Sequence, residues 1–274
     1  ITTPGLTITP NNSDSGAPET VVSYTHTVTN IGGSNDTFDI TTSSSAGWTV
    51  ALYQSDGVTP LADTDSDTTP DTGSLAPSAS VNIVVKVTVG WNTLNDTTTV
   101  TGTSSLDLGV QRSAVDTTAA PPTITIVISD DSAAFGTNLD PEGPNSNSGD
   151  SVLDYQSSVG NQGSYYVWRA SGSGLTVTVK SNRPWDGTVA ASENSGTATS
   201  MSIASGVLRY AEGSEPTSYS ACAPATAFTT ASSPWKSSIP EGIQIYAHYY
   251  CLRVDWDDDP GDFISTVTYT VTQV

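Results

Sequence analysis

The chain has little positive charge and no long apolar run, and each shortage excludes a class of partner or location. Its 274 residues include eight Lys and Arg against 28 Asp and Glu, a net charge of −20. Affinity for a phosphate backbone comes from Lys and Arg that displace counterions, so nucleic acid is excluded as a partner. No stretch is long and apolar enough to form a membrane-spanning helix. The negative charge is spread evenly, with −10 on each side of residue 120, and it favours solubility and the recruitment of cations.

Cysteine is equally scarce. Cys222 and Cys251 are the only two, and their separation of 29 residues does not form the CxxC pair of a zinc site or redox centre. We expect a disulfide between them, with two buried free thiols as the alternative. Three Asn-x-Ser/Thr acceptors for N-glycosylation occur, at Asn11, Asn35 and Asn95. An acidic, Ser- and Thr-rich chain with such acceptors is typical of secreted or cell-surface proteins, where disulfides persist, so we predict an extracellular location.

Histidine is limited to His26 and His248, and the familiar catalytic motifs are missing. Both histidines fall in strand-like stretches, so we expect them to be packed rather than to act as bases. The sequence has no Gly-x-Ser-x-Gly elbow, no His-Glu-x-x-His and no Gly-rich phosphate loop after a strand. We therefore expect no enzymatic activity. Glycoside hydrolysis by a carboxylate pair stays open, because the spacing of carboxylates in a cleft cannot be read from a sequence.

Helix signals are nearly absent, whereas apolar residues alternate with polar ones in many short stretches. In Val81–Val89 every odd position is Val or Ile, which predicts a strand with one buried face. Val22–Thr29 and Trp48–Leu52 alternate in the same way. About seven such strands fit into the first 120 residues, and two packed antiparallel sheets of immunoglobulin-like type are the natural closure for that number. The predicted fold class is all-β.

The chain divides at Asp116–Pro122, where two prolines favour an extended spacer that cannot donate to a sheet. We predict a first domain at 1–117, a linker at 118–122 and a second β-sandwich at 123–274. Alternation resumes in the second part with Ile124, Ile126 and Ile128. The stretches 136–163 and 211–240 are rich in Ser, Gly, Asn and Pro and are expected to be long loops, which are either functional or held by partners and ions.

Seven short motifs follow one another in the first part of the chain. They are Tyr24–Gly33, Asp36–Ile40, Gly47–Val50, Asp63–Gly73, Leu75–Pro77, Val87–Val89 and Asp96–Ser105. In this order, over residues 18–117, they resemble one repeat of the NEW3/DUF11-type surface domains, immunoglobulin-like modules of large secreted bacterial and archaeal proteins. The resemblance implies a structural or spacer module without catalytic residues. Many such repeats carry Asp-x-Asp-x-Asp-Gly in the corresponding loop, and here Thr68 replaces the glycine.

One short loop concentrates four carboxylates. They are Asp63, Asp65, Asp67 and Asp71. Their mutual repulsion opposes a compact loop, whereas a hard divalent cation takes six to eight oxygens at roughly 2.3–2.6 Å and would turn the repulsion into ligation. We therefore predict a calcium site, with a solvated acidic turn as the alternative. The loop is not an EF-hand, because Thr68 and Ser74 occupy the positions of its glycine and closing glutamate.

A second acidic cluster lies between two expected strands near the end of the chain. Its carboxylates Asp257, Asp259 and Asp262 could form a second calcium site, and the alternative is an exposed acidic turn.

Three tryptophans, Trp185, Trp235 and Trp256, lie in or beside loops that contain Pro or Gly. Exposed aromatic rings beside carboxylates often hold sugars, so these residues are candidate sugar contacts. The alternative is that each ring covers an edge of the core.

Both ends of the sequence have the pattern of strands, Ile1–Pro10 and Ile264–Val274. Each strand could complete its own domain or add to a sheet of the next subunit, as in donor-strand assembly. Together these features predict a calcium-stabilised, non-enzymatic structural subunit that binds other copies of itself in an extracellular filament, pilus-like fibre or surface layer. The alternative is a cell-surface adhesin or carbohydrate-binding module, with cell-surface glycans as its partner.

Overall fold

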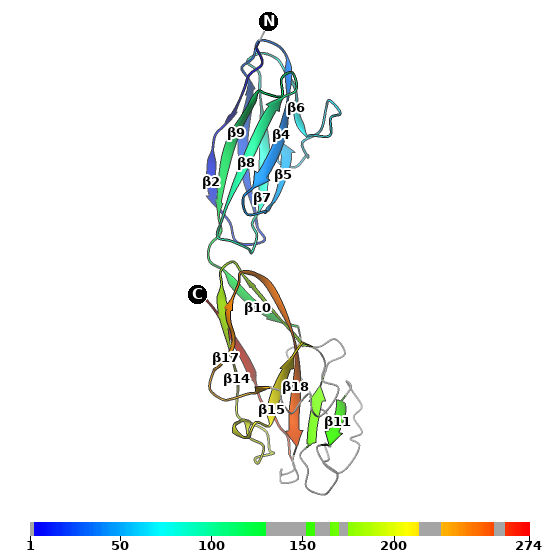
Figure 1. Ribbon diagram of the computed structural model, residues 1–274, viewed down its shortest axis with the longest axis vertical. Coiled ribbons are helices and arrows are strands. Elements are labelled where there is room, and N and C mark those ends of the chain that lie inside the picture. The colour runs from blue at the N-terminus through cyan, green and yellow to red at the C-terminus, as the bar shows by residue number, and fades with distance from the viewer. Residues whose placement is uncertain (1–2, 130–151, 157–164, 170–174, 214–225, 255–260) are drawn as a thin grey trace. The chain divides into compact units, whose positions relative to one another are not determined.

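The computed structural model describes residues 3–129, 152–156, 165–169, 175–213, 226–254 and 261–274, which belong to two compact units, Ile1–Thr123 and Ile124–Val274 (Figure 1). Apart from one short 3-10 helix, Ile203–Ser205, the regular elements of these residues are strands. The predicted all-β class is confirmed. No helix in the described ranges has the length and hydropathy that a membrane span needs.

Unit 1 is a sandwich of two sheets. Four strands pair in the order β1-β3-β7-β5 and five in the order β2-β9-β8-β4-β6. These pairings are antiparallel except that of β2 with β9. The immunoglobulin-like, two-sheet closure is therefore as predicted. The strands are β1 (Leu6–Thr9), β2 (Asn12–Ser15), β3 (Val21–Asn30), β4 (Asp36–Ser44), β5 (Thr49–Gln54), β6 (Asp71–Leu75), β7 (Ser80–Thr88), β8 (Asn95–Ser104) and β9 (Gln111–Ala119).

Alternation places the core of unit 1 between its two sheets. Val28 of β3 and Val85 of β7 point inward from one sheet, while Phe38 of β4 and Val100 of β8 meet them from the other, and none of the four is exposed. Each side chain of this kind contributes about 1.5–3 kcal/mol by leaving water. This burial fixes the register of the strands, because a slip of one residue would turn the apolar set to solvent.

Two strands of unit 1, β2 and β6, were not predicted. Their sequences, Asn-Ser-Asp-Ser and Asp-Thr-Gly-Ser-Leu, lack apolar alternation. They belong to the sheet through backbone pairing with β9 and β4. Strand β9 also continues two residues beyond the boundary at 117, because Thr118 and Ala119 still pair with β8. The N–H of Ala120 then donates to the carbonyl of Leu94 at 2.7 Å, so sheet pairing extends into the expected linker.

A buried polar pair joins the two sheets. His26 on β3 and Asp116 on β9 are both fully buried, with His26 Nε2 2.8 Å from Asp116 Oδ2. The other ring nitrogen, Nδ1, donates to the carbonyl of Pro10 at 2.9 Å, and Asn12 Nδ2 donates to Asp116 Oδ1 at 2.9 Å. His26 is thus a packed residue, as predicted, and it fixes the segment in which the chain passes from β1 to β2.

Unit 2 also consists of two sheets. One follows the order β10-β13-β18-β12-β11, in which β15 also pairs with β18 and β16 pairs with β15. The other follows β17-β14-β19. Fully buried Val177, Val179 and Trp185 pack between them. The strands are β10 (Ile124–Ile128), β11 (Val152–Gln156), β12 (Tyr165–Arg169), β13 (Leu175–Ser181), β14 (Trp185–Ala191), β15 (Leu208–Glu212), β16 (Thr226–Ala227), β17 (Ser233–Ile239), β18 (Gly242–Val254) and β19 (Val267–Gln273).

The stretches expected to be long loops contain strands. The first stretch, 136–163, contains β11. The second stretch, 211–240, contains the end of β15 and the whole of β16 and β17. The strand β17 could not be predicted from its sequence, Ser-Pro-Trp-Lys-Ser-Ser-Ile, because it has Pro at its second position and no apolar alternation. Its pairing with β14 is irregular, with register shifts on both sides of Gly187.

The terminal strands complete their own units. β1 pairs with β3 and buries Leu6 and Ile8 in the core of unit 1, and β19 pairs with β14 in unit 2. In this chain both terminal strands are therefore paired within their own units, and donation of a strand to a neighbouring subunit stays a prediction.

We predict that Asp116→Ala lowers the stability of unit 1 by about 3–5 kcal/mol, because it leaves a buried polar partner without its counterpart. Asp14→Ala is the matched control, since Asp14 is an exposed aspartate on the adjacent strand β2, and surface changes of this kind cost within about 0.5 kcal/mol. Urea denaturation followed by circular dichroism measures both. Equal small effects would contradict a stabilising role for the buried pair.

Candidate metal centre

The predicted acidic loop folds over the outer face of β4. Ile40 N–H donates to the carbonyl of Pro70 at 2.8 Å, and Asp71 N–H donates to that of Ala62 at 2.8 Å. These bonds place Asp71, the first residue of β6, directly opposite Asp39 of β4 after a bulge. Asp39 and Asp71 are only 7% and 2% exposed. The loop therefore covers the carboxylate of Asp39, a residue of β4.

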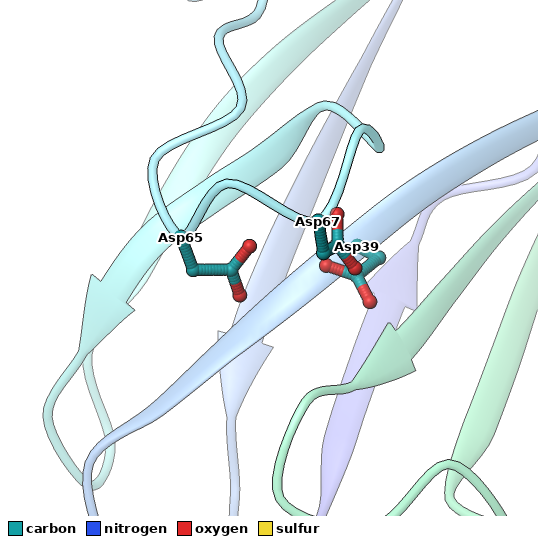
Figure 2. Close-up of side chains that lie close together, drawn as sticks. All are labelled: Asp39, Asp65 and Asp67. Carbon is teal, nitrogen blue, oxygen red and sulfur yellow. The ribbon is translucent and has the colours of Figure 1, made fainter.

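Two overlapping groups of three carboxylates result. One comprises Asp39, Asp65 and Asp67 and the other Asp63, Asp65 and Asp71, and within each group one oxygen of every residue lies within 4.8 Å of the others. Figure 2 shows Asp65 and Asp67 on the loop with their carboxylates near that of Asp39 on the strand beneath. The four predicted loop aspartates are thus divided between two groups, and Asp65 belongs to both.

Asp63 and Asp71 organise the loop backbone. The carboxylate of Asp63 accepts hydrogen bonds from the N–H groups of Ser66 at 2.7 Å and Thr68 at 2.9 Å. The bond from Thr68 is the largest of the effects that lower the pKa of Asp63, and burial opposes it only in part. Asp71 accepts from the hydroxyl of Thr64 at 2.7 Å and from the N–H of Gly73 at 2.6 Å. Both carboxylates are therefore already engaged in shaping the loop.

The carboxylate of Asp39 has different surroundings from those of Asp63 and Asp71. Burial raises its pKa, and the carboxylates of Asp67, Asp65 and Asp71 raise it further. Its hydrogen bond comes from the hydroxyl of Ser105, at 3.5 Å, and the same hydroxyl donates to Asp65 Oδ2 at 3.2 Å. Like charges opposite one another on paired strands destabilise a sheet. A cation among these groups would remove that cost.

Another buried carboxylate shows the contrast. Asp96 is 1% exposed, and burial is the largest influence on its pKa and acts to raise it. Hydrogen bonds from Thr98, Ala46, Ser44 and Ser45 outweigh the burial and lower its pKa. Four donors therefore hold Asp96 as an anion. Asp39, in contrast, has one long hydrogen bond and three neighbouring carboxylates instead of four donors.

The donor set of the first group suits a hard divalent ion. Asp39, Asp65 and Asp67 each place one carboxylate oxygen within 4.8 Å of the others, and the hydroxyl of Ser105 lies 3.2 Å from Asp65 Oδ2. Such oxygens are the ligands that calcium takes, and water would complete the six to eight. Sequence reasoning missed Asp39 and Ser105. The available signal for Asp39 was an aspartate between Phe38 and Ile40 in a predicted strand, where alternation turns it to the outer face that the loop then covers.

The loop backbone has the conformation that favours glycine at Thr68. Ser66 and Thr68 have positive φ angles of 68° and 83°. Thr68 thus adopts a left-handed conformation that is unfavourable for a β-branched residue, at the position where the predicted resemblance would place Gly. The bonds to Asp63 hold it there.

The second predicted calcium site is described only in part. Asp257 and Asp259 lie outside the described residues. Asp262 is exposed, and its backbone is bound through its N–H to the Thr197 hydroxyl at 2.8 Å and through its carbonyl to the N–H of Ala198 at 3.1 Å.

The predicted disulfide lies outside the described part of the chain, because Cys222 and the side chain of Cys251 fall there. The three glycosylation acceptors Asn11, Asn35 and Asn95 are exposed. Asn11 also accepts a hydrogen bond from Val115 N–H through its Oδ1 atom, at 2.9 Å.

The proposed sugar platform at Trp185 is wrong. Trp185 begins β14, and its ring is fully buried between the sheets of unit 2, so no ligand can stack on it. Trp235 is half-buried, its indole N–H donates to Glu212 at 3.1 Å, and its ring meets that of Trp185 at 6.0 Å between centroids. The alternative, that these rings close the core, is therefore correct for both. Trp256 lies outside the described residues.

His248 is packed, as predicted. It is 1% exposed, and burial, its dominant influence, lowers its pKa. Its Nδ1 atom lies 2.6 Å from the hydroxyl of Tyr269 and its Nε2 atom 3.1 Å from Glu212 Oε2, so both ring nitrogens are engaged.

No protein-family model and no curated protein match the chain. Similar solved structures include the secreted serine protease VesC from Vibrio cholerae, at 12% identity and a TM-score of 0.29, with 98% of this chain and 51% of the protease chain covered. The chain thus spans about half the length of that protease.

Two further structures are similarly distant. One is a chain from a chaperone-tip adhesin complex of CFA/I fimbriae biogenesis, at 8% identity and a TM-score of 0.27, with 88% of this chain and 93% of that chain covered. The other is the C-terminal domain of the Streptococcus pyogenes antigen I/II-family protein AspA, at 7% identity and a TM-score of 0.26, with 99% of each chain covered. With TM-scores below 0.5, these similarities carry no functional argument, and the resemblance to NEW3/DUF11-type repeats stays a prediction.

In calcium-free buffer, we predict that Asp39→Asn stabilises unit 1 at pH 7. A raised pKa means that Asp39 contributes stability below its ordinary value of 3.8 and loses it as the pH rises through the higher folded value. The variant should therefore exceed the wild type in stability at pH 7, and the difference should shrink toward pH 4. Urea denaturation between pH 4 and pH 7 measures it. Asp96→Asn, which changes a buried carboxylate with four hydrogen-bond donors, should lower the stability of unit 1 at pH 7. If both variants changed the stability in the same direction, the contrast between Asp39 and Asp96 would be contradicted.

We also predict that Thr68→Gly stabilises the loop by about 1 kcal/mol, because glycine adopts a positive φ without the cost that a side chain incurs. The control is Thr69→Gly, at a neighbour without a positive φ, which should be neutral or destabilising. Thermal unfolding of both variants compares them. A loss of stability in Thr68→Gly would show that the threonine side chain stabilises the loop.

Proposed function

We propose that the chain is a non-enzymatic structural subunit of an extracellular assembly, and that calcium bound by Asp39, Asp65 and Asp67 stabilises its first unit. The observation that carries the proposal is the buried carboxylate of Asp39, which faces three other carboxylates and has a single long hydrogen bond. Calcium is abundant outside cells and takes oxygen ligands of the kind that these carboxylates offer.

The position of the loop explains how the ion would act. The loop connects β5, at the edge of the four-stranded sheet, to β6, at the edge of the five-stranded sheet. An ion held between the loop and β4 therefore ties the connection between the two sheets to a strand inside one of them. The role of the ion would be mechanical, to keep the edge of the sandwich closed, and it would not take part in a reaction.

The histidines support a structural role. His26 and His248 are buried, and both nitrogens of each ring are engaged with protein atoms. A general base needs access to a substrate proton. A spacer module of the NEW3/DUF11 type remains the family that we propose for unit 1, and the exposed glycosylation acceptors accord with an extracellular location. The assembly partner that we propose is a further copy of the same chain.

Calcium should raise the melting temperature of unit 1. At a free concentration about 100 times Kd, a ligand that binds only the folded state adds about 2.7 kcal/mol, or roughly 10 °C for a domain of this size. Asp65→Asn combined with Asp67→Asn should abolish the increase. Differential scanning calorimetry in calcium and in EGTA measures the shift, and negative-stain microscopy of the same samples should show regular fibres or sheets in calcium.

Asp56→Asn is the matched control, because Asp56 lies in the same connection but in neither carboxylate group, and this variant should respond to calcium like the wild type. A melting temperature that is the same in calcium and EGTA would refute the metal site. Dispersed particles under every condition would refute the assembly.

A further inference from the structure

A network of hydrogen bonds around His248 joins the two sheets of unit 2. His248 lies on β18 of the seven-stranded sheet, and its Nδ1 atom is 2.6 Å from the hydroxyl of Tyr269 on β19 of the three-stranded sheet. The hydroxyl of Tyr269 also lies 3.0 Å from that of Tyr250 on β18. On the other side of the ring, Nε2 is 3.1 Å from Glu212 of β15, the strand that pairs with β18. The imidazole therefore lies between a carboxylate and a pair of tyrosine hydroxyls.

Glu212 also makes contacts that cross between the sheets. From β17 of the three-stranded sheet, Trp235 Nε1 donates to Glu212 at 3.1 Å and Lys236 Nζ donates to it at 2.5 Å. The contacts of this network that cross between the sheets thus end on Glu212 or on Tyr269. His248 connects these two residues, so the protonation of its ring affects both.

The partners of His248 determine which ring nitrogen carries the proton. Burial raises the pKa of Glu212, but the hydrogen bonds from Lys236 and Trp235 outweigh it and lower the pKa, so Glu212 is ionised. An ionised carboxylate only accepts hydrogen bonds, so Nε2 carries the proton of the neutral ring. Nδ1 is then an acceptor. Tyr269 therefore donates to Nδ1, and Tyr250 donates to Tyr269.

A second proton on His248 conflicts with this arrangement. The new Nδ1–H would meet the hydroxyl of Tyr269 as a second donor, and that hydroxyl would have to turn toward Tyr250. Within the described part of the chain, Tyr269 is the single hydrogen-bond partner of the Tyr250 hydroxyl, which would then lose its acceptor. His248 and Tyr250 are 1% and 8% exposed, so water does not replace the lost bond, and an unpaired buried donor is costly.

The surroundings of His248 also disfavour a positive charge. Burial, the largest influence, lowers its pKa, Glu212 raises it, and Lys236 lowers it. On the other side of β18, β13 places the apolar Leu175 beside His248. Four tyrosines lie on the strands around the ring, and burial raises the pKa of each above its ordinary value of 10: Tyr210, Tyr246, Tyr250 and Tyr269. Between pH 5 and pH 7, His248 is therefore the group of this network whose charge changes.

We propose that His248 is an acid-sensitive switch in unit 2: uptake of a proton by its ring breaks the hydrogen bonds through Tyr269 and loosens the three-stranded sheet from the seven-stranded sheet. The switch is independent of the calcium site, which lies in unit 1. Because the folded pKa is lowered, unit 2 keeps the contribution of the network above the ordinary value of 6.5 and loses it as the pH falls from 6.5 toward the lower folded value.

Nuclear magnetic resonance of the full chain tests the direction of the hydrogen bonds. The sequence has two histidines, so His248→Gln assigns their signals by the loss of one set. At pH 7 the nitrogen chemical shifts should show His248 as the neutral tautomer with its proton on Nε2. A proton on Nδ1 would overturn the proposal, because Tyr269 could not then donate to the ring.

Amide hydrogen exchange measures the switch itself. Linkage of one proton makes the opening of unit 2 easier by up to about tenfold per pH unit below 6.5. Protection of the amides of β14, β18 and β19 should therefore fall by up to about tenfold from pH 6 to pH 5 in the wild type. His248→Gln cannot take up this proton and should lack the fall. Equal falls in both chains, or none in the wild type, would overturn the switch.

Two tyrosine variants distinguish a switch from a histidine that only packs. Tyr269→Phe removes the hydroxyl that donates to Nδ1, so His248 should bind its proton about tenfold more tightly, the order expected for one lost hydrogen bond. Tyr246→Phe is the matched control, because Tyr246 lies on β18 but its hydroxyl belongs to none of these bonds, and the titration of His248 should not change. The same titration in both variants would overturn the role of Tyr269. If a variant does not fold, the tautomer and the amide exchange of the wild type still decide the proposal.

Discussion

A strand in a sandwich turns alternate side chains to the core and to the outside, and whatever covers the outside must satisfy the polar groups that it finds there. β4 is the strand where this constraint matters most. Phe38 and Ile40 fill the core, so Asp39 between them points outward, and the connection from β5 to β6 then covers it. The acidic centre, formed by Asp39, Asp63, Asp65, Asp67 and Asp71, and the contact of its loop with Ser105 both follow from this covered outer face.

Three buried carboxylates of unit 1 lie in different surroundings. Asp96 is surrounded by hydroxyl and N–H donors that favour its charged form. Asp116 is paired with His26 and Asn12. Asp39 has neither kind of partner, and its neighbours are carboxylates. Asp39 is therefore the candidate ligand although Asp96 and Asp116 are more deeply buried, because it lacks the donors that those two residues have.

The connection between β8 and β9 is linked to the acidic loop. Ser105, which follows β8, donates to Asp65 at 3.2 Å. The loop itself joins β5 and β6, the edge strands of the two sheets. An ion that holds the loop would therefore also hold the start of the connection between β8 and β9.

The sequence by itself determined the all-β class, the two-sheet closure of unit 1 and the packing of both histidines, because these follow from side-chain alternation, which is local. It also placed four of the five aspartates of the acidic centre, since they share one loop. Asp39 could not be identified, because its role depends on which strand pairs with β6 and on the bulge that sets Asp39 opposite Asp71. Trp185 was misplaced for the same reason: a ring beside a loop in sequence lies in the core once β13 and β14 face each other. Only the tertiary structure decides what covers a strand's outer face, because that cover comes from residues distant in sequence.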